Sequence, residues 1–320
     1  MAYLMVLIAL VFMAVKGFCG KKIGVYTRHT GDAYLFNFLR VSLCLAIGLC
    51  LVFFSGDQAA LAVDGGLLAI SAFAGAANAA FMVCWLLAVQ SNSMVTVDVS
   101  LTVGSLLPAV LCIFCFGEPF SWQKLVGFAV ILLATVILAG YNKSLKGKPT
   151  VAGILLVVAA AVSDGCISFS QQLYKHYYTA GGSKAGERLY PNSVFQVYTY
   201  VFAALLLGAF FLGYLLLQKK KGHGAVDEPP RRTRSVGDFF KGPLPLIAVM
   251  AVSLFAANFF QTSATSDYGM SPQVLYPMIK GAGLVIVNIN AALFFHERVT
   301  PRSLLGSALA LVGVVVVNVF

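Results

Sequence analysis

The feature that most constrains this chain is a succession of long apolar segments separated by short polar connections. A helix needs about 20 predominantly apolar residues to cross the hydrocarbon core of a bilayer. Apolar residues make up 59% of the 320-residue chain and charged residues 11%, against roughly 25% charged residues in soluble domains. The sequence therefore predicts an all-α integral membrane protein with about ten transmembrane helices, at residues 2–19, 33–54, 66–89, 94–116, 123–140, 151–173, 193–217, 243–266, 271–295 and 300–320.

Most lysines and arginines behind the net charge of +10 lie in the connections beside these predicted spans. Cations at these places bind anionic lipid and follow the positive-inside rule. We therefore expect the lipid bilayer, and not nucleic acid, to be the partner of this charge. The basic connections follow the odd-numbered spans, and the largest cluster lies in residues 218–242. The rule thus predicts that these connections are cytoplasmic and that both termini are outside.

An internal repeat organises the chain. Residues 116–127 match residues 295–306 without a gap, so that Glu118 falls on Glu297. Weaker matches upstream extend the repeat and predict an N-terminal repeat in residues 1–142 and a C-terminal repeat in residues 150–320, each with five transmembrane helices. Because five is an odd number, two copies of one fold must cross the membrane in opposite directions. Inverted repeats of this kind are typical of secondary transporters.

These residues carry a resemblance to a known family. The repeated Phe-x-Glu with its short polar turn and glycine-containing helix, together with Phe38 and Arg40 in the second span, resembles the drug/metabolite transporter superfamily, in particular its ten-helix members with two EamA-like halves. The resemblance covers nearly the whole chain. It implies export or exchange of drugs, amino acids, sugars, nucleotide derivatives or other metabolites through a central cavity, without ATP hydrolysis. Such relatives are usually drawn with both termini inside the cell, opposite to the orientation that the charges predict.

The repeated helices also predict how the bundle is held together. Glu118 and Glu297 stand at span ends before a turn and a new helix, so we expect them to fix helix hairpins, with proton transfer as the alternative. Small residues recur on one face of the fifth and tenth spans, which favours close helix packing or a homodimer through these terminal helices: Gly127, Ala134, Gly306, Ala310 and Gly313.

Ionisable side chains inside a membrane span are costly and therefore point to function. Lys280 lies mid-span, beside helix-weakening proline and glycine residues, and Tyr276 shares its helix face. In the repeat alignment Lys280 falls one turn from Asp98, which predicts an Asp98–Lys280 pair that either binds substrate or acts as a structural lock. Lys16 and Arg40 lie closer to span ends, where a side chain can extend to the interface or pair locally.

Asp164 is the acidic residue of the sixth span, and it occupies the place that Lys16 has in the first. Related small multidrug exporters use a first-helix glutamate for proton coupling. The first-helix position of this chain is basic, so Asp164 is the predicted coupling residue.

Polar and aromatic side chains line one face of the third span and one face of the eighth. Asn78 and Trp85 lie on the first face, and Asn258 and Gln261 lie on the second. The repeat places the two faces opposite each other across a central cavity, where a few hydrogen-bonding groups in an apolar wall are typical of a small-molecule site. Hydrogen bonding between helices is the alternative explanation.

Taken together, these features favour a secondary transporter for a small organic substrate, working by alternating access in the cell membrane. Efflux or exchange of metabolites or drugs is the first expectation, and transport of sugars or nucleotide derivatives is the alternative. No residues have the spacing of a catalytic or metal site, so we expect no enzyme activity, no catalytic residues, no metal and no cofactor. A membrane enzyme or a channel is the remaining alternative.

Overall fold

The computed structural model describes most of the chain, with gaps. The described residues are 1–27, 30–91, 94–104, 106–117, 122–146, 150–179, 189–220, 236–270, 275, 276, 278–280, 282, 283, 286, 290, 293, 294 and 300–319. Within these ranges the protein is helical and contains no β-strand. The all-α prediction is therefore confirmed for the described part of the chain.

The helices follow the apolar segments closely. Their bounds are α1 (Ala2–Ile23), α2 (Thr30–Ser55), α3 (Gly65–Ser91), α4 (Met94–Gly104), α5 (Leu106–Phe116), α6 (Trp122–Lys146), α7 (Val151–Tyr178), α8 (Asn192–Lys220), α9 (Val236–Lys241), α10 (Pro243–Ser266) and α12 (Pro301–Val319), with 3₁₀ turns at Gly24–Tyr26 and Asp57–Leu61. The described residues from 275 to 294 are also helical, and we call them the Lys280 segment.

Six of the described helices are long and apolar enough to cross a membrane. They are α1 with the turn after it, α2, α3, α7, α8 and α10. Shorter apolar helices occupy Ser100–Phe116, Leu125–Ala134 and Leu304–Gly313. Large apolar side chains such as Leu155, Leu205 and Leu305 are more than half exposed, as expected where a helix faces lipid.

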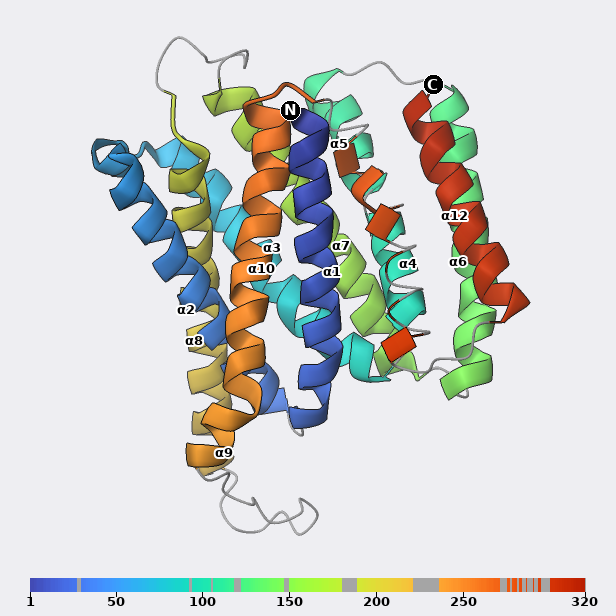
Figure 1. The fold of residues 1–320 in the computed structure, drawn as a ribbon, viewed down its shortest axis with the longest axis horizontal. Helices are drawn as coiled ribbons and strands as arrows, with labels where there is room; N and C mark the ends of the chain where they lie inside the picture. The colour runs from blue at the N-terminus through green and yellow to red at the C-terminus, as the bar shows by residue number, and fades with distance from the viewer. Residues whose placement is uncertain are drawn as a thin grey trace.

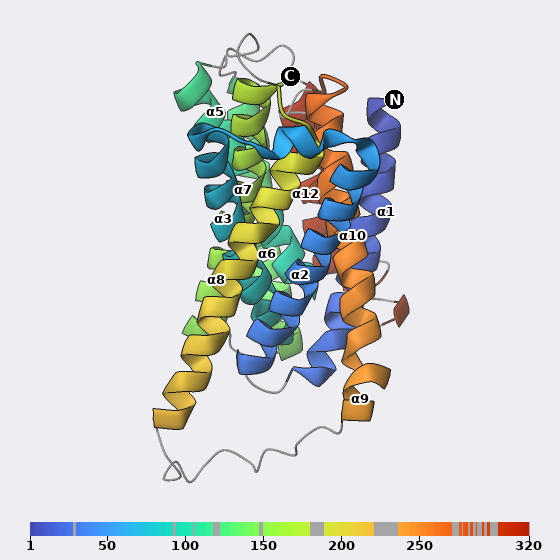
Figure 2. The ribbon, with the colours of Figure 1, turned by 90° about the vertical axis from the view of Figure 1, so that its left-hand side faces the viewer.

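The helices pack side by side as one bundle. The closest pairs are α1 with α10, α2 with α8, α3 with α7, and α6 with α12 (Figure 1). Both chain termini lie at one end of the bundle, which we call the terminus end, and α9 lies at the other, the α9 end (Figure 2). In Figure 1, α6 and α12 form one edge of the bundle, and α2 and α8 form the opposite edge.

Close backbone approach joins α6 to α12. A Cβ atom added to Gly313 would lie 2.9 Å from the carbonyl oxygen of Gly127 and 2.7 Å from Cγ1 of Ile131. All the small residues singled out on these two helices are buried, including Ala134 and Ala310. The predicted close packing is confirmed, and it occurs between two helices of one chain. The predicted homodimer through the terminal helices stays a prediction.

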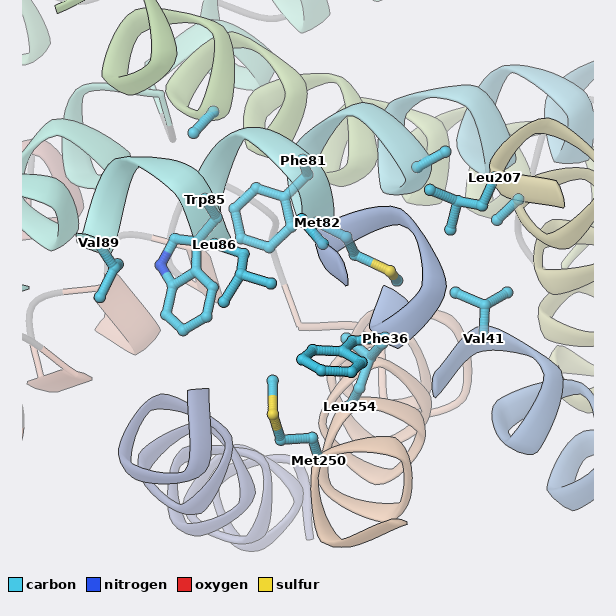
Figure 3. Close-up of a cluster of buried hydrophobic side chains, with 14 of the residues drawn as sticks. Phe36, Val41, Phe81, Met82, Trp85, Leu86, Val89, Leu207, Met250 and Leu254 are labelled. Carbon is cyan, nitrogen blue, oxygen red and sulfur yellow. The ribbon is translucent and has the colours of Figure 1, made fainter. Parts of the chain in front are cut away.

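A cluster of buried apolar and aromatic side chains fills the centre between α2, α3 and α10. Figure 3 shows Phe36 of α2 beside Met250 and Leu254 of α10, with Met82 and Trp85 of α3 above them. Because lipid is as apolar as these side chains, packing contacts hold the helices together in a membrane more than exclusion from water does. This packed centre supports one wall of the cavities described next.

Candidate functional site

Two small adjoining cavities lie in the middle of the bundle. The larger has a volume of about 50 Å³ and is lined by residues that include Trp85, Leu101 and Ile286. The smaller has a volume of about 20 Å³ and is lined by residues that include Asn78, Asn258 and Gln261. Four residues line both cavities: Met13, Lys16, Phe81 and Lys280. The walls therefore come from α1, α3, α4, α7, α10 and the Lys280 segment.

A buried ion pair lies at this place. Nζ of Lys280 is 2.5 Å from a carboxylate oxygen of Asp164, and the two side chains are only 10% and 12% exposed. Asp164 is held on α7, where the next residue, Gly165, lets α4 approach closely, because a Cβ there would lie 2.5 Å from the carbonyl oxygen of Gly104. Pairing offsets part of the cost of taking both charges out of water. The sequence singled out both residues but did not pair them.

The predicted partner of Lys280 was Asp98. Asp98 belongs to α4, which packs against α7, but its side chain lies outside the described part of the structure. The Asp98–Lys280 pair therefore stays a prediction. The hairpin residues Glu118 and Glu297 also lie outside the described residues.

A layer of hydrogen bonds lies one to two helical turns from the ion pair, toward the terminus end. The hydroxyl of Tyr276 accepts a bond from Nε2 of Gln172 at 3.0 Å and lies 2.8 Å from Oε1 of Gln171 and 3.1 Å from the carbonyl oxygen of Ser168. Nε2 of Gln261 on α10 donates to the same Gln171 oxygen at 3.1 Å. This layer ties α7, α10 and the Lys280 segment together beside the cavities.

Two residues of this layer, Tyr276 and Gln261, were predicted from the sequence. Gln171, Gln172 and Ser168 were not. A signal for them exists, because two adjacent glutamines are unusual in an apolar span and Gln171 lies two turns after Asp164, on the same helix face.

The other predicted polar residues reach the cavities with their own local bonds. Nδ2 of Asn78 donates to the carbonyl oxygen of Ala74 at 2.9 Å, and Nδ2 of Asn258 donates to the hydroxyl of Tyr200 at 3.0 Å. Trp85 is 3% exposed and lines the larger cavity. The face of α3 and the face of α10 thus meet at one site, and binding of a substrate by these residues stays a prediction.

The structure corrects the expectation for the two cations that were assigned to span ends. Lys16 lines both cavities, and its Nζ lies 5.5 Å from the ring centroid of Phe81, a cation–π contact. Arg40 is only 3% exposed and lies inside the bundle. Each lies on the face of its helix that packs against other helices, and the contact of Lys16 with Phe81 agrees with the local pairing that the sequence offered as the alternative.

Comparisons with known proteins agree with this architecture. No family model matches the chain. A solved crystal structure, described only as that of a protein, has the same fold, with a TM-score of 0.63 and 16% identity over 99% of this chain and 97% of the other.

A relative in sequence indicates the class of protein. The multidrug transporter PA4990 of Pseudomonas aeruginosa is 31% identical over 81 residues, which are 25% of this chain and 71% of that protein. Together with the six apolar helices, this relationship identifies a multi-pass membrane protein. The chain belongs to the family of membrane transporters that includes PA4990.

Proposed function

We propose that this protein is a secondary transporter that moves small organic metabolites or drugs across the cell membrane by alternating access, in the direction of efflux or in exchange. The observation that carries this proposal is the pair of cavities at mid-bundle, both lined by Lys280 and the smaller one also by its ion-pair partner Asp164. Ionisable groups at membrane depth are typical of substrate and ion pathways. The relationship to a multidrug transporter supports the same class of activity.

We further propose ten spans arranged as two inverted five-helix repeats of the drug/metabolite transporter superfamily. In such a repeat α1 corresponds to α7, α2 to α8, α3 to α10 and α6 to α12. This correspondence turns the α1–α10 contact into the α7–α3 contact, and it leaves the α2–α8 and α6–α12 contacts unchanged. The contact between α2 and α10 likewise becomes that between α8 and α3. In addition, α1 runs away from the terminus end whereas α7 runs toward it (Figures 1 and 2). This symmetry supports the repeat.

The size of the cavities fits an occluded conformation. Sites for drug-sized ligands have volumes of about 300 to 1,000 Å³, whereas the larger cavity here has about 50 Å³. The bundle must therefore open to admit a substrate, which is the movement that alternating access requires. The hydrogen-bonded layer around Tyr276 lies on the terminus side of the ion pair, so opening toward that end would break its bonds.

In this proposal the predicted residues divide into two roles. Asp164 is the coupling residue, because its carboxylate can bind either Lys280 or a proton. Substrate contacts come from the lysine and from the polar and aromatic groups around it: Lys280, Asp98, Tyr276, Trp85, Asn78, Asn258 and Gln261.

Transport by purified protein in liposomes tests the proposal. Uptake of a labelled panel that includes cationic dyes, amino acids, sugars and nucleotide derivatives is measured with and without a pH gradient. We expect at least one compound to accumulate, and Lys280→Ala to abolish its uptake because the ion pair is lost. Lys219→Ala, an exposed lysine near the end of α8, is the matched control and should transport normally. Absence of uptake for the entire panel would contradict the proposal.

The coupling role has its own test. If Asp164 exchanges a proton during transport, Asp164→Asn should remove the pH dependence of uptake while exchange of labelled for unlabelled substrate continues. A parent protein whose uptake does not respond to pH, or an Asn variant with the full pH response, would exclude this role.

A further inference from the structure

Arg40 is a buried cation that the proposed transport site does not use. It lies on the inner face of α2 and is 3% exposed, and its Nε is buried without a hydrogen-bond partner. No described residue forms a hydrogen bond or an ion pair with its guanidinium group. A charge held inside a protein without a partner is strongly unfavourable. An anion close to this group would offset that cost.

Among the described residues, the groups near Arg40 are hydrogen-bond donors, and none of the described carboxylates pairs with it. Cys44, one turn along α2, donates its Sγ hydrogen to the carbonyl oxygen of Ala251 on α10 at 3.3 Å. Tyr200 of α8 is also fully buried, within electrostatic range of Arg40 and Cys44. Arg40 thus lies where α2, α8 and α10 meet.

The hydroxyl of Tyr200 adds to this donor set. It accepts the bond from Asn258, and none of the described groups accepts its own hydrogen. A guanidinium group has five N–H donors and no acceptor. A small anion supplies the acceptor that both groups lack.

The site is close to the proposed transport cavity. Asn258 bonds to Tyr200 and also lines the smaller cavity, as does Leu254 one turn earlier on α10. Asn258 therefore links the Tyr200 hydroxyl to the space that the Lys280–Asp164 pair lines. Rotation of Asn258 away from Tyr200 would connect the two.

We propose that Arg40, Tyr200 and Asn258 form a binding site for a small monoanion, which is either a free halide or the carboxylate group of a transported molecule. Arg40 supplies the charge, and Tyr200 donates a hydrogen bond. Asn258 connects the site to the cavity. The carboxylate source rests on the proposed transport function, whereas the halide source does not.

Anion-dependent thermal stability of the purified full-length protein tests this site. Chloride, bromide or acetate replaces isethionate at constant ionic strength, so that general screening by salt stays unchanged. We expect a saturable rise in the unfolding temperature, because a ligand at a hundredfold excess over its Kd raises the ratio of folded to unfolded protein about a hundredfold. A rise with halides alone assigns the site to a free halide, and a rise with acetate assigns it to carboxylates.

Two variants link the effect to Arg40. Arg40→Gln should lose the anion dependence, whereas Arg302→Gln, which alters an exposed arginine at the start of α12, should retain it. If Arg40→Gln does not fold, Tyr200→Phe provides the test, because loss of one hydrogen bond should weaken anion affinity about tenfold.

The outcomes separate this inference from the transport proposal. No anion dependence in the parent protein, or an unchanged dependence in Arg40→Gln or Tyr200→Phe, would overturn the anion site. Because binding is measured without transport, anion stabilisation in a protein that transports nothing would support the site and count only against the proposed function.

Discussion

Separating the members of the Lys280–Asp164 pair should destabilise the protein far more than removing both together. Lys280→Met leaves the Asp164 carboxylate without its partner at 2.5 Å, and Asp164→Asn leaves the ammonium group without its counter-charge. Breaking a buried ion pair by removing one partner costs about 3 to 5 kcal/mol, whereas replacing both partners is often close to neutral. Because both side chains are about nine-tenths buried, this range applies to the pair.

The measurement is a double-mutant cycle on the free energy of unfolding in mixed detergent micelles. Each single variant is expected to lose about 3 kcal/mol, since an unpaired group can change its protonation and avoid the full cost. The double variant should lose far less than the sum of the two. A coupling energy below about 0.5 kcal/mol, which is the usual scatter of independent sites, would refute the pairing.

A second cycle tests the partner that the sequence predicted. Asp98→Asn is combined with Lys280→Met under the same conditions. If Asp164 is the principal partner, the Asp98 cycle should show the smaller coupling energy. A larger value for Asp98 would mean that the predicted Asp98–Lys280 pair dominates in the membrane protein.

Two further predictions concern particular contacts, and a third concerns the orientation of the protein in the membrane. Gly313→Leu should cost more than about 1 to 3 kcal/mol of unfolding free energy by overpacking the α6–α12 contact, whereas Gly213→Leu, where an added Cβ meets nothing within 4 Å, should cost little. Tyr276→Phe should cost about 1 to 3 kcal/mol by leaving Nε2 of the buried Gln172 without its acceptor, and equal stability to the parent would contradict the layer. In a cysteine-free background, Phe240→Cys on exposed α9 should resist impermeant maleimide in intact cells, because the positive-inside rule makes that end cytoplasmic, and rapid labelling would reverse the orientation.

The sequence predicted the helices well because their signal is local. Long apolar runs ended by charge, glycine or proline correspond closely to the bounds of α2, α7 and α10. The small residues of α6 and α12 were also informative, because a spacing of three, four or seven residues defines one helix face regardless of the rest of the fold. What this pattern did not decide was whether the face packs within the chain or between two chains.

The partners of the buried charges were harder to predict, since they depend on how each helix is rotated and shifted along its axis. The repeat alignment compared Lys280 with its counterpart in the other half, near Asp98, and so favoured a pair that crosses the pseudo-twofold axis. Asp164 and Lys280 lie in the same half of the chain, and no repeat relates them to each other. Their contact arises because α7 and the Lys280 segment share the Tyr276 hydrogen-bond layer, which holds the two charges at matching depth.

The burial of Arg40 was also hard to predict, because it depends on how α2 is rotated about its axis. Its position in the sequence, ten residues into α2, is compatible with a side chain that extends to the interface. The rotation of α2 instead places Arg40 on the face toward α8 and α10, the face that also carries Cys44. A residue four positions away on the same helix shares its face, so the fully buried Cys44 could have indicated that Arg40 is buried too. A cation that neighbours an apolar, buried residue at this spacing is better interpreted as a binding group than as a membrane anchor, and the anion titration of Arg40→Gln decides between the two.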